Sequence, residues 1–262
     1  MVEYLHKEGN AALYSRSTQT LLETPLFAAA ASGHEAVVRY IVENTQNEED
    51  KERGSLAERI DDINSIGATP LYYAAFNGHL NIVTYLADKG NFSLSLSLSL
   101  SLSLFLSLSL PLSHTQHTHT HTYWVIYITG SHLFDYVDKS PLFVATQAGH
   151  SHVVTYILDR MGDRENVVDG PTKNGRTPLF IAAKKGYLSL VELLLAKGAQ
   201  LKNAQKKNGS TPLYAAAKKG QSVIVKLLLE RGAEVETQRH SDGKTSLYVA
   251  AEEGREDIVI HL

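Results

Sequence analysis

Cysteine is absent from this chain of 262 residues. Its absence excludes a disulfide-bonded scaffold, a zinc finger and a thiol nucleophile, and it agrees with a reducing compartment. Residues 1–7 include no apolar stretch of the kind that a secretory signal requires. The formal net charge is only -3, so the total charge does not indicate nucleic-acid binding. We expect a cytoplasmic protein, with the nucleus as the alternative location.

The motifs of catalysis are missing as well. The sequence contains no glycine-rich phosphate loop, no G-x-S-x-G turn, no H-E-x-x-H motif and no paired carboxylates in a recognisable frame. Apolar residues make up 43% of the chain and charged residues 20%, which is typical of a folded globular protein. We therefore expect a non-catalytic protein that holds neither a cofactor nor a metal ion.

A repeated pattern is the main feature that the sequence does contain. Each copy begins with Thr or Ser, has a pair of small residues five and six positions later, and reaches a glycine nine positions later. An aliphatic pair follows at offsets 13 and 14, and another aliphatic residue at offset 17. The six copies begin at Thr24, Thr69, Ser140, Thr177, Thr211 and Thr245.

Each position of this pattern has a physical role. A Thr or Ser hydroxyl caps the N-terminus of a helix, and the proline that follows in five copies suits the first helical position. Glycine adopts the left-handed conformation that ends this helix, and the aliphatic residues form the buried stripe of a second helix. Because one helix pair cannot bury its own apolar face, neighbouring pairs are predicted to stack into a solenoid.

The pattern resembles the ankyrin repeat, which has a period of about 33 residues and a T-P-L-H-x-A signature. The best match begins at Gly175, passes through Thr177-Pro178-Leu179 and ends at Ala199. The resemblance implies an all-α solenoid of helix-turn-helix repeats with short β-hairpin loops. An aromatic residue replaces the family's histidine in every copy. We expect an aromatic packing role at Phe27, Tyr72, Phe143, Phe180, Tyr214 and Tyr248.

The repeat spacing divides the chain into three regions. Residues 1–90 hold a half repeat and two repeats, residues 91–136 form a low-complexity insert, and residues 137–262 hold four repeats, the last of them truncated. Both ends fall inside a repeat and lack a polar capping repeat, so we expect a fragment of a longer array or an incomplete gene model. Histidines that follow repeat glycines are expected to be structural: His34, His79 and His150.

Residues 43–66 lengthen the first spacing with eight acids against three bases. The run contains a capping-box pattern, and Leu56, Ile60 and Ile63 fall on one helical face. We interpret it as an acidic loop that carries a short helix. A tolerated surface insertion is favoured over a binding finger.

The insert alternates Ser with Leu from residue 94 to residue 112 and then alternates His with Thr. Two adjacent dinucleotide repeats in DNA would be read as these residue pairs, so the leading hypothesis is translated noncoding sequence, with disorder as the structural expectation. A membrane span is not expected because half of the residues are serine. Only adventitious metal affinity is expected of its histidines, His114, His117, His119 and His121.

Charge is distributed unevenly along the C-terminal repeats. Residues 171–232 contain twelve bases and two acids, whereas residues 233–262 contain seven acids and three bases. In the ankyrin family, the two positions after the small pair line the concave face and contact partners together with the hairpin tips. The resemblance therefore implies a partner-binding surface that includes Phe76, Asn77, Gln147, Arg176, Lys184, Lys185, Lys207, Lys218, Lys219, Glu252 and Glu253.

The expected function is a non-catalytic adaptor or scaffold that binds a protein partner, with an acidic segment of that partner on the lysines. The other explanation of the lysines is that they complement helix dipoles and keep the solenoid soluble. Nucleic acid is not expected, because no aromatic platform is interleaved with the bases. The alternative function is the ankyrin portion of a larger enzyme or membrane channel whose functional domain lies outside this chain.

Overall fold

The computed structural model describes residues 23–44, 60, 62–89, 139–161, 167–202 and 208–262. The chain divides into two compact units, residues 1–138 and residues 139–262. The predictions for the insert at 91–136, and those for residues 45–59 of the acidic loop, fall on residues that lie outside the described ranges.

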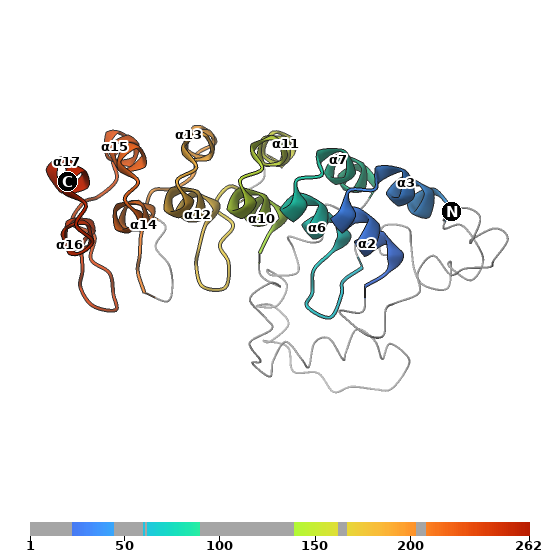
Figure 1. Ribbon diagram of the computed structural model, residues 1–262, viewed down its shortest axis with the longest axis horizontal. Coiled ribbons are helices and arrows are strands. Elements are labelled where there is room, and N and C mark those ends of the chain that lie inside the picture. Colours follow the sequence, from blue (N-terminus) through green and yellow to red (C-terminus); the bar gives the residue numbers. More distant parts are fainter. Residues whose placement is uncertain (1–22, 45–59, 61, 90–138, 162–166, 203–207) are drawn as a thin grey trace, which may run out of the picture. The chain divides into compact units, whose positions relative to one another are not determined.

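Unit 1 contains two described helix pairs (Figure 1). The first helices of the two pairs pack against each other, as do the second helices, and each first helix also packs against the second helix of its own pair. The four helices are α2 (Pro25–Ser32), α3 (Glu35–Glu43), α6 (Pro70–Asn77) and α7 (Leu80–Lys89).

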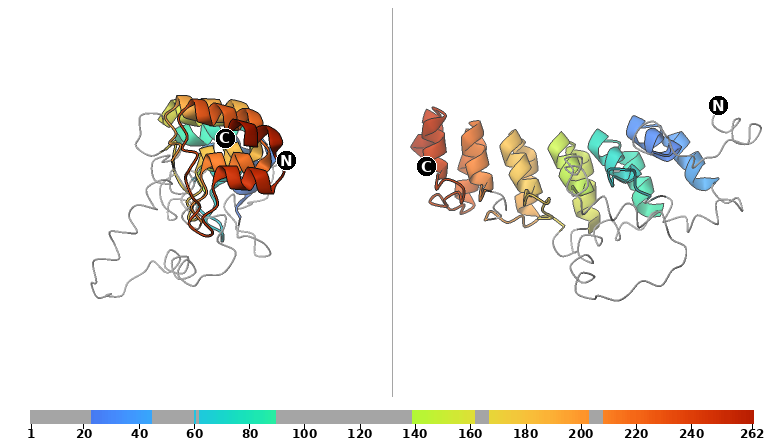
Figure 2. Two further views of the ribbon diagram at one scale, coloured as in Figure 1. Left: turned by 90° about the vertical axis from the view of Figure 1, so that its left-hand side faces the viewer. Right: turned by 90° about the horizontal axis from the view of Figure 1, so that it is seen from below.

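Unit 2 contains four described helix pairs that lie in two rows (Figures 1 and 2). The inner row, from which the long loops extend, consists of α10 (Pro141–Ala148), α12 (Pro178–Lys185), α14 (Pro212–Lys219) and α16 (Ser246–Glu252). The outer row consists of α11 (Ser151–Met161), α13 (Leu188–Ala196), α15 (Ser222–Glu230) and α17 (Glu256–His261). Neighbours within each row pack against each other, so the predicted helical solenoid is confirmed within the unit.

The inner-row helices begin and end as the repeat pattern predicts. The hydroxyl of Thr177 accepts a hydrogen bond from the Phe180 backbone N–H at 3.2 Å, and Pro178 follows the cap. Gly186 then ends α12 with a φ of +85°. Most other copies repeat this arrangement, although Thr24 makes no such side-chain bond and α16 ends at Glu252 with Glu253, rather than Gly254, as its C-cap.

The predicted second-helix stripe forms the core between the rows. In α13, Leu190 is 1% exposed, and Val191 and Leu194 are fully buried. The aromatic residue that replaces the family's histidine is also buried in five of the six repeats, where its exposed fraction is between 1% and 6%. The packing prediction is therefore confirmed for these five residues and is wrong for Tyr248, which is 54% exposed.

The loops before α6, α12 and α16 each contain a tight turn, and the described residues contain no strand. Each turn is closed by two backbone hydrogen bonds, an outer one and an inner one. The outer bonds run from Asn64 N to Ala68 O at 3.0 Å, from Thr172 N to Arg176 O at 2.9 Å, and from Arg239 N to Lys244 O at 3.0 Å. The β-hairpins that the resemblance implied are thus reduced to turns, which hold polar side chains beside the inner row.

Candidate binding surface

The ends of the inner-row helices of unit 2 carry the predicted charged pairs. Lys184 and Lys185 occupy the last turn of α12, and Lys218 and Lys219 occupy the last turn of α14. The second lysine of each pair is exposed and the first is half-buried. Because α12 packs against α14, the two pairs lie on neighbouring helices, as the repeat register predicts.

Lys184 lies among positive charges. Burial lowers its pKa, and the nearby cations Arg176, Lys219, Lys185 and Lys218 lower it further, in that order of effect. Like charges act on a pKa in this way only when they lie close together. Because α12 packs against α14 and the other four cations act on Lys184, we name these five predicted residues the basic cluster: Arg176, Lys184, Lys185, Lys218 and Lys219.

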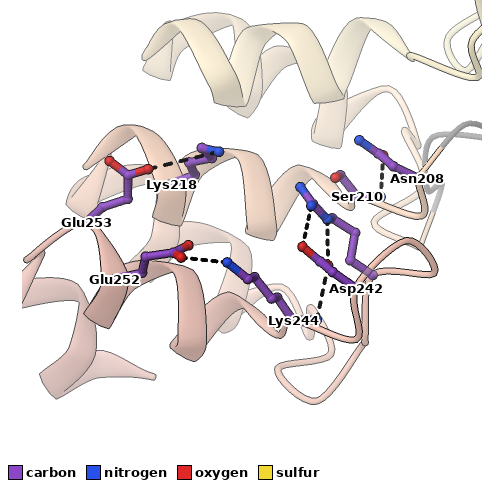
Figure 3. A network of polar contacts seen from close by, with 8 residues as sticks. Asn208, Ser210, Lys218, Asp242, Lys244, Glu252 and Glu253 are labelled. Atoms are coloured by element: carbon purple, nitrogen blue, oxygen red, sulfur yellow. Dashed lines mark hydrogen bonds and ion pairs between the residues drawn. The ribbon is translucent and has the colours of Figure 1, made fainter.

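The end of the next helix of the row, α16, and its C-cap carry two acids, of which one contacts this group and the other contacts Lys244 (Figure 3). The Lys218 ammonium lies 4.0 Å from a Glu253 carboxylate oxygen. Glu252 accepts a hydrogen bond from the Lys244 ammonium at 2.5 Å. The sequence predicted that Glu252 and Glu253 give the corresponding position of the last repeat a negative charge. The structure places them at that position and pairs both of them with bases of the same chain.

Lys244 belongs to a turn whose side chains form a polar network with residues of α14 and α16 (Figure 3). Arg239 donates two hydrogen bonds to Asp242, at 2.9 and 2.5 Å, and lies over the Tyr214 ring at 5.2 Å from its centroid. These bonds lower the pKa of the Asp242 carboxyl. Lys244 lies 4.8 Å from the centroid of the Tyr248 ring, and the Glu252 carboxylate raises the pKa of Lys244. The bases of this turn are therefore already engaged.

The remaining members of the basic cluster are not neutralised in this way. Within the part of the chain that the structure describes, no acid forms an ion pair with Arg176, Lys184, Lys185 or Lys219. Arg176 is exposed in the turn before α12, beside the start of the same helix that carries two of the lysines. The positive charge available to a ligand is thus concentrated at α12 and the adjoining edge of α14.

Two other predicted residues of the C-terminal repeats are not assigned to this cluster. Gln147 lies near the end of α10 and is half-buried. Lys207 falls on residues outside the described ranges.

The equivalent positions in unit 1 are uncharged. Phe76 is 39% exposed at the end of α6. Asn77 donates a hydrogen bond from Nδ2 to the Ala31 carbonyl at 2.9 Å. This carbonyl lies at the end of α2, where helical carbonyls lack partners within the helix. Asn77 therefore links two repeats, which the sequence pattern alone did not indicate.

His79 has the structural role that the sequence predicted. Its Nε2 lies 3.0 Å from the Ala31 carbonyl oxygen, to which it donates, and its ring packs against Gly33 of the preceding repeat. His150 lies 6.0 Å from His152, measured between ring centroids. Within the described ranges no three His, Cys, Asp or Glu residues are grouped closely enough to hold a metal ion.

Sequence reasoning missed Arg239 and Lys244 as part of this surface. Both bases precede the capping residue of α16, a place that the repeat pattern leaves variable. A search for bases within reach of Glu252 and Glu253 would have found Lys244, which lies eight residues before Glu252.

Two further findings bear on what the chain is. None of the helices in the described part of the chain has the length and apolar character that a membrane span requires. A family model described as ankyrin repeats, in three copies, matches residues 1–95, 125–205 and 199–262. The matched ranges leave out residues 96–124, which lie within the low-complexity insert.

Proposed function

The chain belongs to the ankyrin-repeat family, and on this basis we propose that unit 2 binds an acidic segment of a partner protein at the four members of its basic cluster other than Lys218. Ankyrin repeats in general mediate protein–protein interaction. The observation that supports an acidic ligand is the group of four cations, Arg176, Lys184, Lys185 and Lys219, that no described acid neutralises. Complementary charge speeds association and selects the partner.

A non-catalytic adaptor or scaffold role agrees with the character of this surface. Its lysines sit at helix ends on an open face, and the aromatic residues of the same helices, such as Phe180 and Tyr214, are turned into the core. Single-stranded nucleic acids are commonly bound by exposed aromatic rings on which bases stack. The surface therefore suits carboxylates better than nucleobases.

Reversing the charge at α12 tests the proposal. Lys184→Glu with Lys185→Glu should weaken binding of a fluorescein-labelled glutamate decapeptide about tenfold or more, because two attractive contacts become repulsive. It should also flatten the dependence of affinity on NaCl between about 50 and about 200 mM, since fewer opposite charges remain to be screened. Fluorescence anisotropy of the full chain measures both quantities.

The matched control is Lys226→Glu with Arg231→Glu, which makes the same change of net charge on α15 of the outer row and at its C-cap. If the control weakens binding as much as the change at α12, net charge rather than the basic cluster drives binding, and the proposal is wrong. A wild-type chain that does not bind the decapeptide contradicts the proposal directly.

The lowered pKa of Lys184 predicts a pH dependence of this binding. A lysine whose pKa is lowered loses its charge before ordinary lysines as the pH rises. Affinity for the glutamate decapeptide should therefore fall as the pH is raised from about 7 towards about 10. The arginine of Lys184→Arg keeps its charge over this range, so the affinity of this variant should fall less. An identical fall of affinity in both proteins would exclude Lys184 as the titrating group.

A further inference from the structure

We propose that Glu253 and Glu252 set the boundary of the anion-binding surface, so that the bound segment places its carboxylates over α12 and Lys219 and carries none over α16. This inference rests on the proposed function and names the charge pattern of the partner. Glu253 is an internal competitor for Lys218, and Glu252 is the internal partner of Lys244.

The two ion pairs differ in geometry, but in both of them a cation is already paired with an acid of the same chain. Lys218 and Glu253 approach to 4.0 Å, with 43% and 37% of their side chains exposed. Lys244 and Glu252 approach to 2.5 Å, and Lys244 is further held over the Tyr248 ring. A ligand carboxylate that reached Lys218 would displace Glu253 or lie beside it, and like charges side by side oppose binding.

Among the described residues, this boundary is confined to the α16 side of Lys218 and has no counterpart on the α12 side. Lys184, Lys185, Arg176 and Lys219 form no ion pair with a described acid. Burial lowers the pKa of Lys184, and repulsion from the other cations of the cluster lowers it further. Negative charge brought to this part of the surface relieves repulsion within the protein as well as forming new contacts. An acidic segment is therefore drawn towards α12 and repelled at α16.

The net charges of the sequence repeat this division. Residues 171–232 carry twelve bases and two acids, and residues 233–262 carry seven acids and three bases. A partner that is acidic along its whole length would meet repulsion at the last repeat. The partner that fits has a short acidic stretch, with uncharged or basic residues on the side that meets α16.

A double-mutant cycle tests this inference with the glutamate decapeptide as the probe. Glu253→Gln should strengthen binding by about three- to tenfold, because Lys218 becomes available and a nearby negative charge is removed. Lys218→Gln should change affinity little in the wild type, and should cancel most of the gain in the Glu253→Gln background. The full chain is used throughout, and circular dichroism confirms that each variant is folded.

Glu256→Gln is the matched control, because Glu256 is an exposed acid of the same repeat that forms no ion pair with the described residues. It removes the same charge and should strengthen binding less than about twofold. If Glu253→Gln gains no more than this control, or if Lys218→Gln weakens binding equally in both backgrounds, the boundary role is wrong.

The outcomes separate this inference from the proposed function. Binding that depends on Lys184 and Lys185 but is insensitive to Glu253 overturns the boundary alone. Absence of wild-type binding, or binding that is indifferent to the change at α12, overturns the proposed function and the boundary with it. A decapeptide with five glutamates followed by five alanines should bind the wild type at least as tightly as the all-glutamate probe, whereas clearly weaker binding would contradict the inference.

Discussion

Replacement of Phe143 by alanine is expected to lower the free energy of unfolding by about 3–5 kcal/mol. The Phe143 side chain is only 2% exposed and lies on α10, which packs against both α11 and α12. The substitution removes a buried ring and leaves a cavity between helices that cannot fully close. Urea unfolding of the full chain, followed by circular dichroism, measures the change.

Tyr248→Ala is the matched control for this prediction. Tyr248 occupies the same offset in its repeat as Phe143 does, but it is 54% exposed. Its replacement should cost less than about 1 kcal/mol, because little apolar surface returns to water. Equal losses for the two variants would show that burial does not determine the contribution of this position.

The contrast between these aromatic residues shows what the sequence pattern can predict. The fixed offset identified a packing position, because the same side of each first helix meets the next repeat. The burial of each individual ring depends on what covers it. Tyr214 is 4% exposed and lies beneath Arg239 of the following turn, while the ring of Tyr248 contacts Lys244. Periodicity contains no information about this difference.

The charged surface was predictable to a similar extent. The repeat register correctly predicted that Lys218 and the acids of α16 lie on neighbouring helices. It did not show that Glu253 reaches Lys218 or that Glu252 is bound by Lys244, because long side chains choose among several neighbours by rotamer. Asn77 is a comparable case, since its hydrogen bond to the Ala31 carbonyl depends on how closely α2 and α6 approach.

The glycine that ends five of the six first helices gives the second large effect on stability. Gly33 has a φ of +79°, a conformation that is unfavourable for residues with a side chain. A Cβ atom at this position would lie 2.6 Å from Cε1 of the His79 ring. Gly33→Ala should therefore lower the free energy of unfolding by about 2 kcal/mol or more, of which the backbone conformation accounts for about 1 kcal/mol.

Gly198→Ala separates the two causes of this loss. Gly198 has a similar φ of +87°, but a Cβ atom added there would meet nothing within 4 Å. This control should cost only the backbone contribution of about 1 kcal/mol. The excess loss in Gly33→Ala then reports the displacement of His79 and of its 3.0 Å hydrogen bond to the Ala31 carbonyl.

A third variant tests whether contact with the His79 ring causes the additional loss of unfolding free energy. If contact with the ring causes it, His79→Ala should remove most of the additional penalty of Gly33→Ala, because the methyl group then has room. Urea unfolding of both single variants and the double variant measures this coupling. Strictly additive losses would mean that the ring moves aside without cost, and the close approach of the two repeats at Gly33 would then contribute little to stability.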